Sequence, residues 1–246
     1  MEEEYIKIWE KSDWTFQARQ IIDTISKFPE NSNLFIIMRH SHRIDTDDMQ
    51  KMANLGLTNL GKGISEIFGS KLPLNRSIRL YYSIVSRCKE TADSILKGFQ
   101  TIGGSGEIFG AFEPMYSFGK DSDFVLKNAY KYPGAKFINR WAAGLFPSKY
   151  IKNFTNYCIH SALDIWNQTN GGKHINIYIT HDLVVMALKY GWFGITPDDK
   201  WVNFLGGFLM TLLKDKILLF DENECKLHEI PYWFNNPKSF LNKKSK

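Results

Sequence analysis

Residues 34–38 form a run of five apolar side chains between a polar segment and a charged one. A short apolar run bounded in this way indicates a strand that is buried on both faces. Such a strand needs helices above and below its sheet, which is the arrangement of α/β proteins. The pattern predicts a three-layer α/β/α fold, with a mostly parallel central sheet flanked by helices.

Further strands and helices are predicted along the rest of the chain. Residues 78–83 and 174–180 are rich in β-branched and aromatic side chains, which is typical of strands. Residues 204–212 and 217–220 predict a closing β-hairpin. Apolar spacing and capping signals predict helices in the second half of residues 5–28 and over about 58–72, 86–99, 151–169 and 183–190.

Residues 107–150 are the least regular region, because aromatic side chains are mixed there with glycine and proline. We expect an inserted cap over the functional site, with aromatic rings that line a substrate pocket. The alternative is that most of these rings form a small satellite core. A length of 246 residues suits a single α/β domain, residues 1–246, that carries this insertion.

Composition narrows the class of protein. Hydrophobic residues make up 43% of the chain and charged residues 23%, as in ordinary soluble globular proteins. The net charge of +5 favours anionic ligands but is too small to indicate a nucleic-acid partner. Part of that charge lies in residues 243–246, which we expect to be a frayed terminus. No apolar run approaches the length of a membrane span, so no membrane partner is expected.

Cysteine usage and the first residues bear on the cellular compartment. Cys88, Cys158 and Cys225 are odd in number, widely spaced, and form no Cys-x-x-Cys pair. We therefore expect a reducing compartment and no disulfide framework. Residues 1–5 are largely acidic and lack the apolar stretch of a secretory signal. Together these features predict a cytoplasmic protein, whose oligomeric state the sequence does not indicate.

The chemistry of the chain changes abruptly where the first predicted strand ends. Arg39, His40, His42 and Arg43 place two arginines and two histidines within five residues. Ligands of open α/β sheets bind outside the carboxyl ends of strands, so a cationic cluster there predicts an anion site. Two fork-shaped guanidinium groups suit the oxygens of a phosphate, and a neutral imidazole between them can accept a phosphoryl group.

Two other interpretations of this cluster are open. Basic residues after a strand are often part of a solvated loop, and residues 44–51 do form a polar segment. His40 and His42 also have the i, i+2 spacing that zinc ligands can have in an extended segment. The flanking arginines would repel a cation, and no Cys/His cluster supplies further ligands. We therefore expect neither a metal nor another cofactor.

Two further strand ends carry similar chemistry. Arg87 lies at the start of the helix that follows residues 78–83, where free backbone N–H groups and the helix dipole favour an anion. His181 and Asp182 directly follow the strand at residues 174–180. Taken alone, the first is better explained as a surface arginine beside a capping serine, and the second as a structural His–Asp pair.

Four motifs in order resemble those of the histidine phosphatase superfamily, which includes histidine acid phosphatases and phosphoglycerate mutases. Residues 39–43 are similar to its Arg-His-Gly-x-Arg signature, and residues 57–61 to its Leu-Thr-x-x-Gly element. Residues 83–92 match its Ser-x-x-x-Arg-x-x-x-Thr-Ala block, and residues 181–182 resemble the His-Asp form of its acid-phosphatase branch. Ser41 departs from the pattern, because the family usually has glycine there, which allows positive φ and close approach. If φ is negative at Ser41, its hydroxyl can contact the phosphate.

The resemblance implies metal-independent hydrolysis of phosphomonoesters through a phosphohistidine on His40. The groups that it implies for holding the phosphoryl oxygens are Arg39, Arg43, Arg87 and His181. It implies Asp182 as the proton donor, because the His-Asp form belongs to the acid-phosphatase branch. Glu113 is the alternative donor, since the mutase branch takes a glutamate from the segment after the third arginine.

Three activities are compatible with this pattern. The first is a phosphatase that acts on a small phosphorylated metabolite, which the sequence does not identify. The second is a phosphoglycerate-type phosphomutase, which would return the phosphoryl group to a second hydroxyl. The third is a non-catalytic phospho-ligand binding module, which Ser41 favours and the intact His40 and His181 disfavour.

Overall fold

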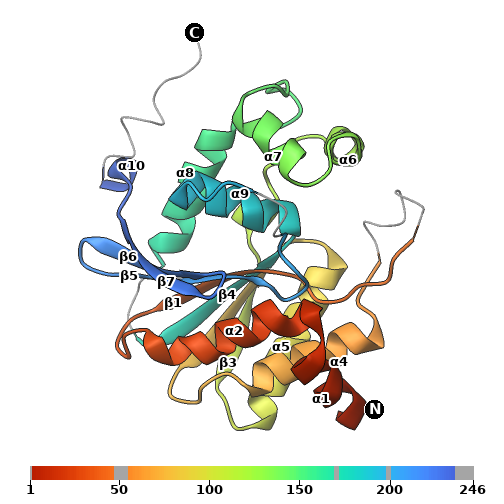
Figure 1. The fold of residues 1–246 in the computed structure, drawn as a ribbon, viewed down its shortest axis with the longest axis vertical. Coiled ribbons are helices and arrows are strands. Elements are labelled where there is room, and N and C mark those ends of the chain that lie inside the picture. Colours follow the sequence, from red (N-terminus) through yellow and green to blue (C-terminus); the bar gives the residue numbers. More distant parts are fainter. Residues whose placement is uncertain (1, 47–54, 169–171, 198–200, 236–246) are drawn as a thin grey trace.

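The computed structural model describes residues 2–46, 55–168, 172–197 and 201–235. A seven-stranded β-sheet lies between two layers of helices (Figure 1). The order of strands across the sheet is β3-β2-β4-β1-β5-β6-β7. The strands are β1 (Leu34–Arg39), β2 (Ser77–Tyr82), β3 (Gly106–Ala111), β4 (His174–Thr180), β5 (Gly207–Leu212), β6 (Lys216–Asp221) and β7 (Glu224–Glu229).

The sheet is mixed, with β1 at the point where the strand direction changes. β3, β2, β4 and β1 are parallel to one another. β5, β6 and β7 continue the sheet in antiparallel pairs from the other side of β1. The predicted three-layer α/β fold is confirmed, and the predicted closing hairpin is present as β5 and β6. Because that hairpin joins the sheet beside β1, only the half that carries the predicted site is parallel.

Helices cover both faces of the sheet (Figure 1). The first layer consists of α1 (Glu2–Lys11), α2 (Phe16–Thr24), α4 (Asn59–Ser70) and α5 (Ser86–Thr101). The second consists of α6 (Ser122–Lys131), α7 (Ala135–Ala142), α8 (Phe154–Trp166) and α9 (Asp182–Phe193). Short 3-10 helices span Asp13–Thr15, Ile25–Lys27 and Glu113–Met115, and the described chain ends in α10 (Tyr232–Asn235).

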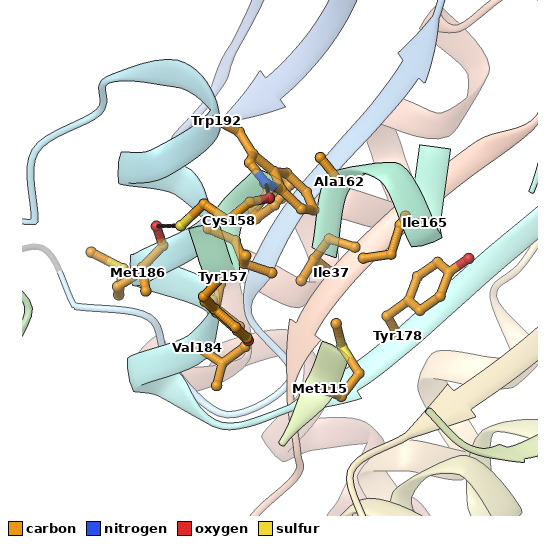
Figure 2. Close-up of a cluster of buried hydrophobic side chains, with 14 of the residues drawn as sticks. Ile37, Met115, Tyr157, Cys158, Ala162, Ile165, Tyr178, Val184, Met186 and Trp192 are labelled. Atoms are coloured by element: carbon orange, nitrogen blue, oxygen red, sulfur yellow. Dashed lines mark hydrogen bonds between the residues drawn. The ribbon is translucent and has the colours of Figure 1, made fainter. Parts of the chain in front are cut away.

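The apolar run of β1 divides between two hydrophobic cores, one on each face of the sheet. Ile36 and Met38 belong to the core beneath α2, α4 and α5, whereas Phe35 and Ile37 belong to the core beneath α8 and α9. Figure 2 shows Ile37 in this second core. All four side chains are 0% exposed, so the strand must be apolar at every position to be stable here.

The predicted elements differ from the observed ones mainly at the edges of the sheet. Residues 107–111, at the start of the predicted insertion, belong to β3, and the hairpin begins at Gly207 and not at residue 204. β7 and α1 have no counterpart among the predicted elements. β3 and β7 are edge strands whose side chains are half-exposed or exposed, so they carry no long apolar run that would reveal them.

Three aromatic residues of the predicted cap are packed inward. Phe137, Trp141 and Phe146, in or next to α7, are buried in the same core as Ile37. These three rings therefore extend a main core, and do not form a satellite core or line an open pocket. The division of the chain into one domain with a cap insertion stays a prediction.

Two predicted segments fall wholly or partly outside the described residues. They are the polar loop, of which residues 47–51 are not described, and the basic terminus at residues 243–246. Within the described ranges, no helix combines the length and the apolar character needed to cross a lipid bilayer.

Candidate active site

The candidate site lies where the neighbouring parallel strands β1, β4 and β2 end. Arg39 is the last residue of β1, and the N–H of His40 donates to the carbonyl of Thr180 at 2.9 Å. The N–H of Ser83, just after β2, donates to the carbonyl of Ile179 at 2.9 Å. These backbone bonds continue the sheet by one residue, so the side chains that follow the three strands meet at one edge.

His40 is the buried centre of this edge, with 2% of its surface exposed. Its Nδ1–H donates to the carbonyl of Ser41 at 2.8 Å, so the lone pair lies on Nε2. Arg87 donates its Nε–H to that Nε2 at 3.1 Å. Burial lowers the pKa of His40 well below its ordinary value, and the neighbouring His181, Arg87 and Arg39 lower it further. The imidazole is therefore neutral, which is the nucleophilic form.

Arg87 joins the two histidines of the site. It lies in the first turn of α5, and its Nη2 donates to His181 Nδ1 at 3.4 Å. His181 then carries its proton on Nε2, which donates to Ser83 Oγ at 3.2 Å. The His40 and His181 rings lie edge to face with centroids 5.4 Å apart. Burial, followed by the charge of Arg87, lowers the pKa of His181 to about 3.

Arg39 supplies a second guanidinium group beside His40. Its Nη1 donates to the carbonyl of Val202 at 3.0 Å, and its Nη2 lies 3.3 Å from Asp182 Oδ2. The guanidinium stacks over the ring of Phe204, 4.3 Å from the centroid. Its Nε–H is buried and has no hydrogen-bond partner among the described residues. A buried donor without a partner is costly, and an anion bound here would satisfy it.

Asp182 begins α9 and is held by three donors. Oδ1 accepts from the N–H of Leu183 at 2.8 Å, and Oδ2 accepts from the indole Nε1–H of Trp201 at 3.1 Å as well as from Arg39. Burial by itself would raise the pKa of this carboxyl. Arg39 and the hydrogen bonds from Trp201 and Leu183 outweigh burial, so the pKa of Asp182 lies below its ordinary value.

Two of the predicted residues have ion-pair partners outside this cluster. Arg43 pairs with Asp45, Nε to Oδ1 at 3.1 Å, although its charge still lowers the pKa of His181. Glu113, the alternative donor, has 69% of its side chain exposed and pairs with Lys152 at 3.2 Å. The structure thus brings together Arg39, His40, Arg87, His181 and Asp182, whereas Arg43 lies beside them and Glu113 faces solvent.

The Leu-Thr-x-x-Gly element supports the loop that contains His40. Thr58 N-caps α4 by accepting from the N–H of Gly61 at 2.9 Å. A Cβ on Gly61 would lie 2.0 Å from the carbonyl oxygen of His42, so only glycine allows this approach. The hydroxyl of Ser41, which is 0% exposed, donates to the carbonyl of Gly61 at 2.8 Å.

Ser41 does not need the backbone freedom of the usual glycine. The non-glycine residues with positive φ in the described chain are Leu205, Glu222 and Asn223, so φ is not positive at Ser41. Its N–H donates to Thr91 Oγ1 at 3.1 Å, which ties the loop to α5. Both polar groups of Ser41 are therefore used for the loop itself.

The two histidines considered as metal ligands face different partners. His42 Nδ1 bonds Thr58 Oγ1 at 2.9 Å, and its ring packs against Phe204 with centroids 5.3 Å apart. His40 instead uses its two nitrogens for Ser41 and Arg87. Across the described ranges, no group of three or more His, Cys, Asp or Glu side chains is placed to hold a metal ion.

The segment 201–206 is a part of the site that sequence patterns did not reveal. It touches Asp182 through the Trp201 indole, and it contacts Arg39 through the Val202 carbonyl and the Phe204 ring. The N–H of Leu205, at φ 56°, donates to the carbonyl of His40 at 3.3 Å. The only mark of this segment in the sequence is its aromatic residues before Gly206 and Gly207, and the predicted hairpin already includes the residues from 204 onward.

Comparison with known proteins gives structural likeness only. No family model and no curated protein matches the chain. It is similar to phosphoglycerate mutase from Bacillus anthracis, with 13% identity and TM-score 0.45 over 82% of this chain and 94% of that one. It is also similar to mycobacterial glucosyl-3-phosphoglycerate phosphatase, with 12% identity and TM-score 0.47 over 80% and 97% of the two chains. The likeness to YhfR of Bacillus stearothermophilus has 17% identity and TM-score 0.46 over 80% and 96%.

Proposed function

We propose that this protein is a metal-independent phosphatase that hydrolyses phosphomonoesters through a phosphohistidine on His40. The observation that carries the proposal is the buried, neutral His40, whose Nε2 lone pair points at the guanidinium of Arg87. A neutral imidazole enclosed by cations is suited to attack a phosphoryl group whose negative charge those cations bind.

In the first step, His40 Nε2 attacks phosphorus in line and the ester P–O bond breaks. Arg87 exchanges its bonds to His40 Nε2 and His181 Nδ1 for bonds to phosphoryl oxygens, so the anion itself frees the nucleophile. Arg39, with its unpartnered Nε–H, also binds a phosphoryl oxygen. Arg43 completes the set, together with His181 once its Nε2–H turns from Ser83 to the phosphoryl group. Catalysis of this kind consists of positioning and of charge stabilisation by fixed donors.

Proton transfer is assigned to Asp182. When Arg39 turns to the phosphoryl group, Asp182 loses the cation that holds its pKa down, and the incoming dianion raises that pKa further. The protonated carboxyl then gives its hydrogen to the leaving alkoxide. In the second step the carboxylate takes a proton from water, whose oxygen attacks phosphorus and breaks the P–N bond to His40.

The geometry favours Asp182 over Glu113 as the proton donor. Asp182 contacts Arg39 directly, whereas the contacts of Glu113 in the described chain are with Lys152 and Ser117. The hydrogen bond from Lys152 is also the main cause that lowers the pKa of Glu113. An exposed carboxylate paired with a lysine is poorly placed to protonate a leaving group at His40.

We further propose a small phosphorylated metabolite as the substrate and the cytoplasm as the compartment. All three cysteines are free, and Cys88 and Cys158 are buried. Burial raises the pKa of the Cys88 thiol to about 12, so it is unreactive although its sulfur lies 3.9 Å from His181 Nε2. Unpaired thiols of this kind are usual in reducing compartments.

The test compares hydrolysis of p-nitrophenyl phosphate by the wild type and by His40→Ala, in EDTA and over acid to neutral pH. We expect metal-independent turnover that the substitution abolishes, and an acid-labile phosphohistidine that only the wild type forms. His160→Ala is the matched control, because His160 is an exposed histidine of α8 away from the site. Phosphate binding without turnover would instead support a binding module, and transfer to an added second hydroxyl would support a mutase.

A further inference from the structure

The indole of Trp201 is the one uncharged side chain that bonds the Asp182 carboxyl in the described structure. Its Nε1–H donates to Asp182 Oδ2 at 3.1 Å, the same oxygen that Arg39 approaches to 3.3 Å. The mechanism above moves Arg39 to the phosphoryl group. After that movement, the bonds that still orient the carboxyl are those from Trp201 and from the N–H of Leu183.

Trp201 is itself held from two sides. Gln17 of α2 donates its Nε2–H to the carbonyl of Trp201 at 3.4 Å and accepts from the N–H of Asn203 at 2.9 Å. On the other side, a Cβ on Gly134 would lie 3.7 Å from Cζ3 of the indole, so the ring packs against the backbone before α7. These contacts hold the backbone of Trp201 against α2 and place its indole against the segment before α7.

An indole N–H only donates, and it can therefore stay bonded to a carboxyl oxygen in both protonation states. It also has no net charge, so an incoming phosphate does not compete for it as it competes for Arg39. A neutral donor that is fixed by the scaffold is suited to hold a carboxyl group that must give up a proton and then take one back.

We propose that Trp201 is a positioning residue that orients Asp182 for proton transfer while Arg39 binds the phosphoryl group. This inference rests on the phosphatase activity proposed above. Among the described residues, the charged and titratable groups that face Asp182 are Arg39 at the end of β1, His181 beside it and Arg87 from α5. The segment 201–206 contributes no charge, so its effect on Asp182 acts through the single indole bond.

The test is Trp201→Phe, which removes the N–H and keeps an aromatic ring against Gly134. Two substrates separate attack on phosphorus from proton donation to the leaving group. p-Nitrophenoxide leaves without protonation, whereas the alkoxide of glycerol 2-phosphate must be protonated to leave. We expect kcat/KM for glycerol 2-phosphate to fall about tenfold while that for p-nitrophenyl phosphate stays within about twofold. Losing a bond that favours the carboxylate should also move the basic limb of the glycerol 2-phosphate profile to higher pH.

The matched control is Trp192→Phe, which removes an indole bond to the carbonyl of Cys158 at 2.8 Å in the core of Figure 2. It should lose stability without changing the ratio of the two kcat/KM values. An equal fall on both probes in Trp201→Phe, or no fall on either, would overturn the positioning role.

A second readout does not depend on turnover. The carboxyl 13C shift of Asp182 should titrate with a higher pKa in Trp201→Phe than in the wild type, and an unchanged pKa overturns the inference. A wild type that hydrolyses neither probe would refute the phosphatase proposal. The titration would still decide whether the indole lowers the pKa of Asp182.

Discussion

Arg87 donates its Nε–H to His40 Nε2 at 3.1 Å, and so covers the nitrogen that would attack phosphorus. The same guanidinium reaches His181 Nδ1 through Nη2 at 3.4 Å. A rigid fork that spans two imidazoles can exchange both bonds for two phosphoryl oxygens without leaving its place. In the proposed mechanism, this exchange couples phosphate binding to release of His40 Nε2.

Replacement of Arg87 with lysine keeps the charge and removes the fork. We expect kcat/KM for p-nitrophenyl phosphate to fall about 100-fold, because one ammonium cannot hold two oxygens in fixed geometry. Steady-state kinetics measure kcat/KM. Calorimetry measures the affinity for inorganic phosphate, which should fall for the same reason. Arg79→Lys is the control, since Arg79 of β2 stacks on Phe109 away from the site. Unchanged phosphate affinity in Arg87→Lys would contradict the assigned role.

Asp182→Asn tests the acid and base steps. The amide keeps the shape of the side chain but cannot accept a proton from water. With p-nitrophenyl phosphate, whose leaving group needs no acid, the phosphohistidine should therefore accumulate and turnover should fall about 100-fold. Rapid quench with detection of acid-labile phosphate measures the intermediate. Glu113→Gln should behave as the wild type, and the opposite pattern in the two variants would move the proton donor to Glu113.

Acid should destabilise the fold through the buried histidines. The pKa of His181 is about 3 in the folded chain against an ordinary value of 6.5, and that of His40 is lowered as well. Between these values the unfolded chain binds protons that the folded chain does not. The free energy of unfolding therefore falls as pH drops from 6.5 towards 3.

The slope of that fall identifies its source. Denaturant titrations at a series of pH values should give a shallower slope for His181→Asn than for the wild type, because one buried titrating group is gone. His160→Asn serves as the exposed control. A slope that does not change in His181→Asn would mean that other groups cause the acid sensitivity.

The strand ends of the site could be predicted because their cause is local in the sequence. The run at residues 34–38 must be apolar to be buried on both faces, and Arg39 and His40 stand out where it stops. Arg87 and His181 follow two neighbouring parallel strands, so they meet at the same edge of the sheet. The burial of Phe137 in a main core could not be predicted, since residue type alone does not say which way a ring points.

The segment 201–206 could not be predicted because its contacts are made between distant residues. The Val202 carbonyl meets Arg39 across 163 positions of sequence, and a backbone carbonyl leaves no trace in residue type. In the sequence Trp201 does not differ from other aromatic residues, and only the fold places its N–H against Asp182. The ion pair between Arg43 and Asp45 could not be predicted either, because the sequence does not say which carboxylate Arg43 contacts.

Substitution of Ser41 tests whether the serine, in place of the usual glycine, stabilises the loop or binds the phosphate. Its hydroxyl donates to the Gly61 carbonyl at 2.8 Å, and Ser65 Oγ donates to the same oxygen at 2.7 Å. Since the acceptor keeps a partner in either variant, Ser41→Ala and Ser65→Ala should each cost about 1 kcal/mol of unfolding free energy. Both should keep kcat/KM near the wild-type value, because neither hydroxyl is directed at a phosphate. Denaturant titration and steady-state kinetics check this pair. A selective loss of kcat/KM in Ser41→Ala would show instead that the serine hydroxyl binds the phosphoryl group.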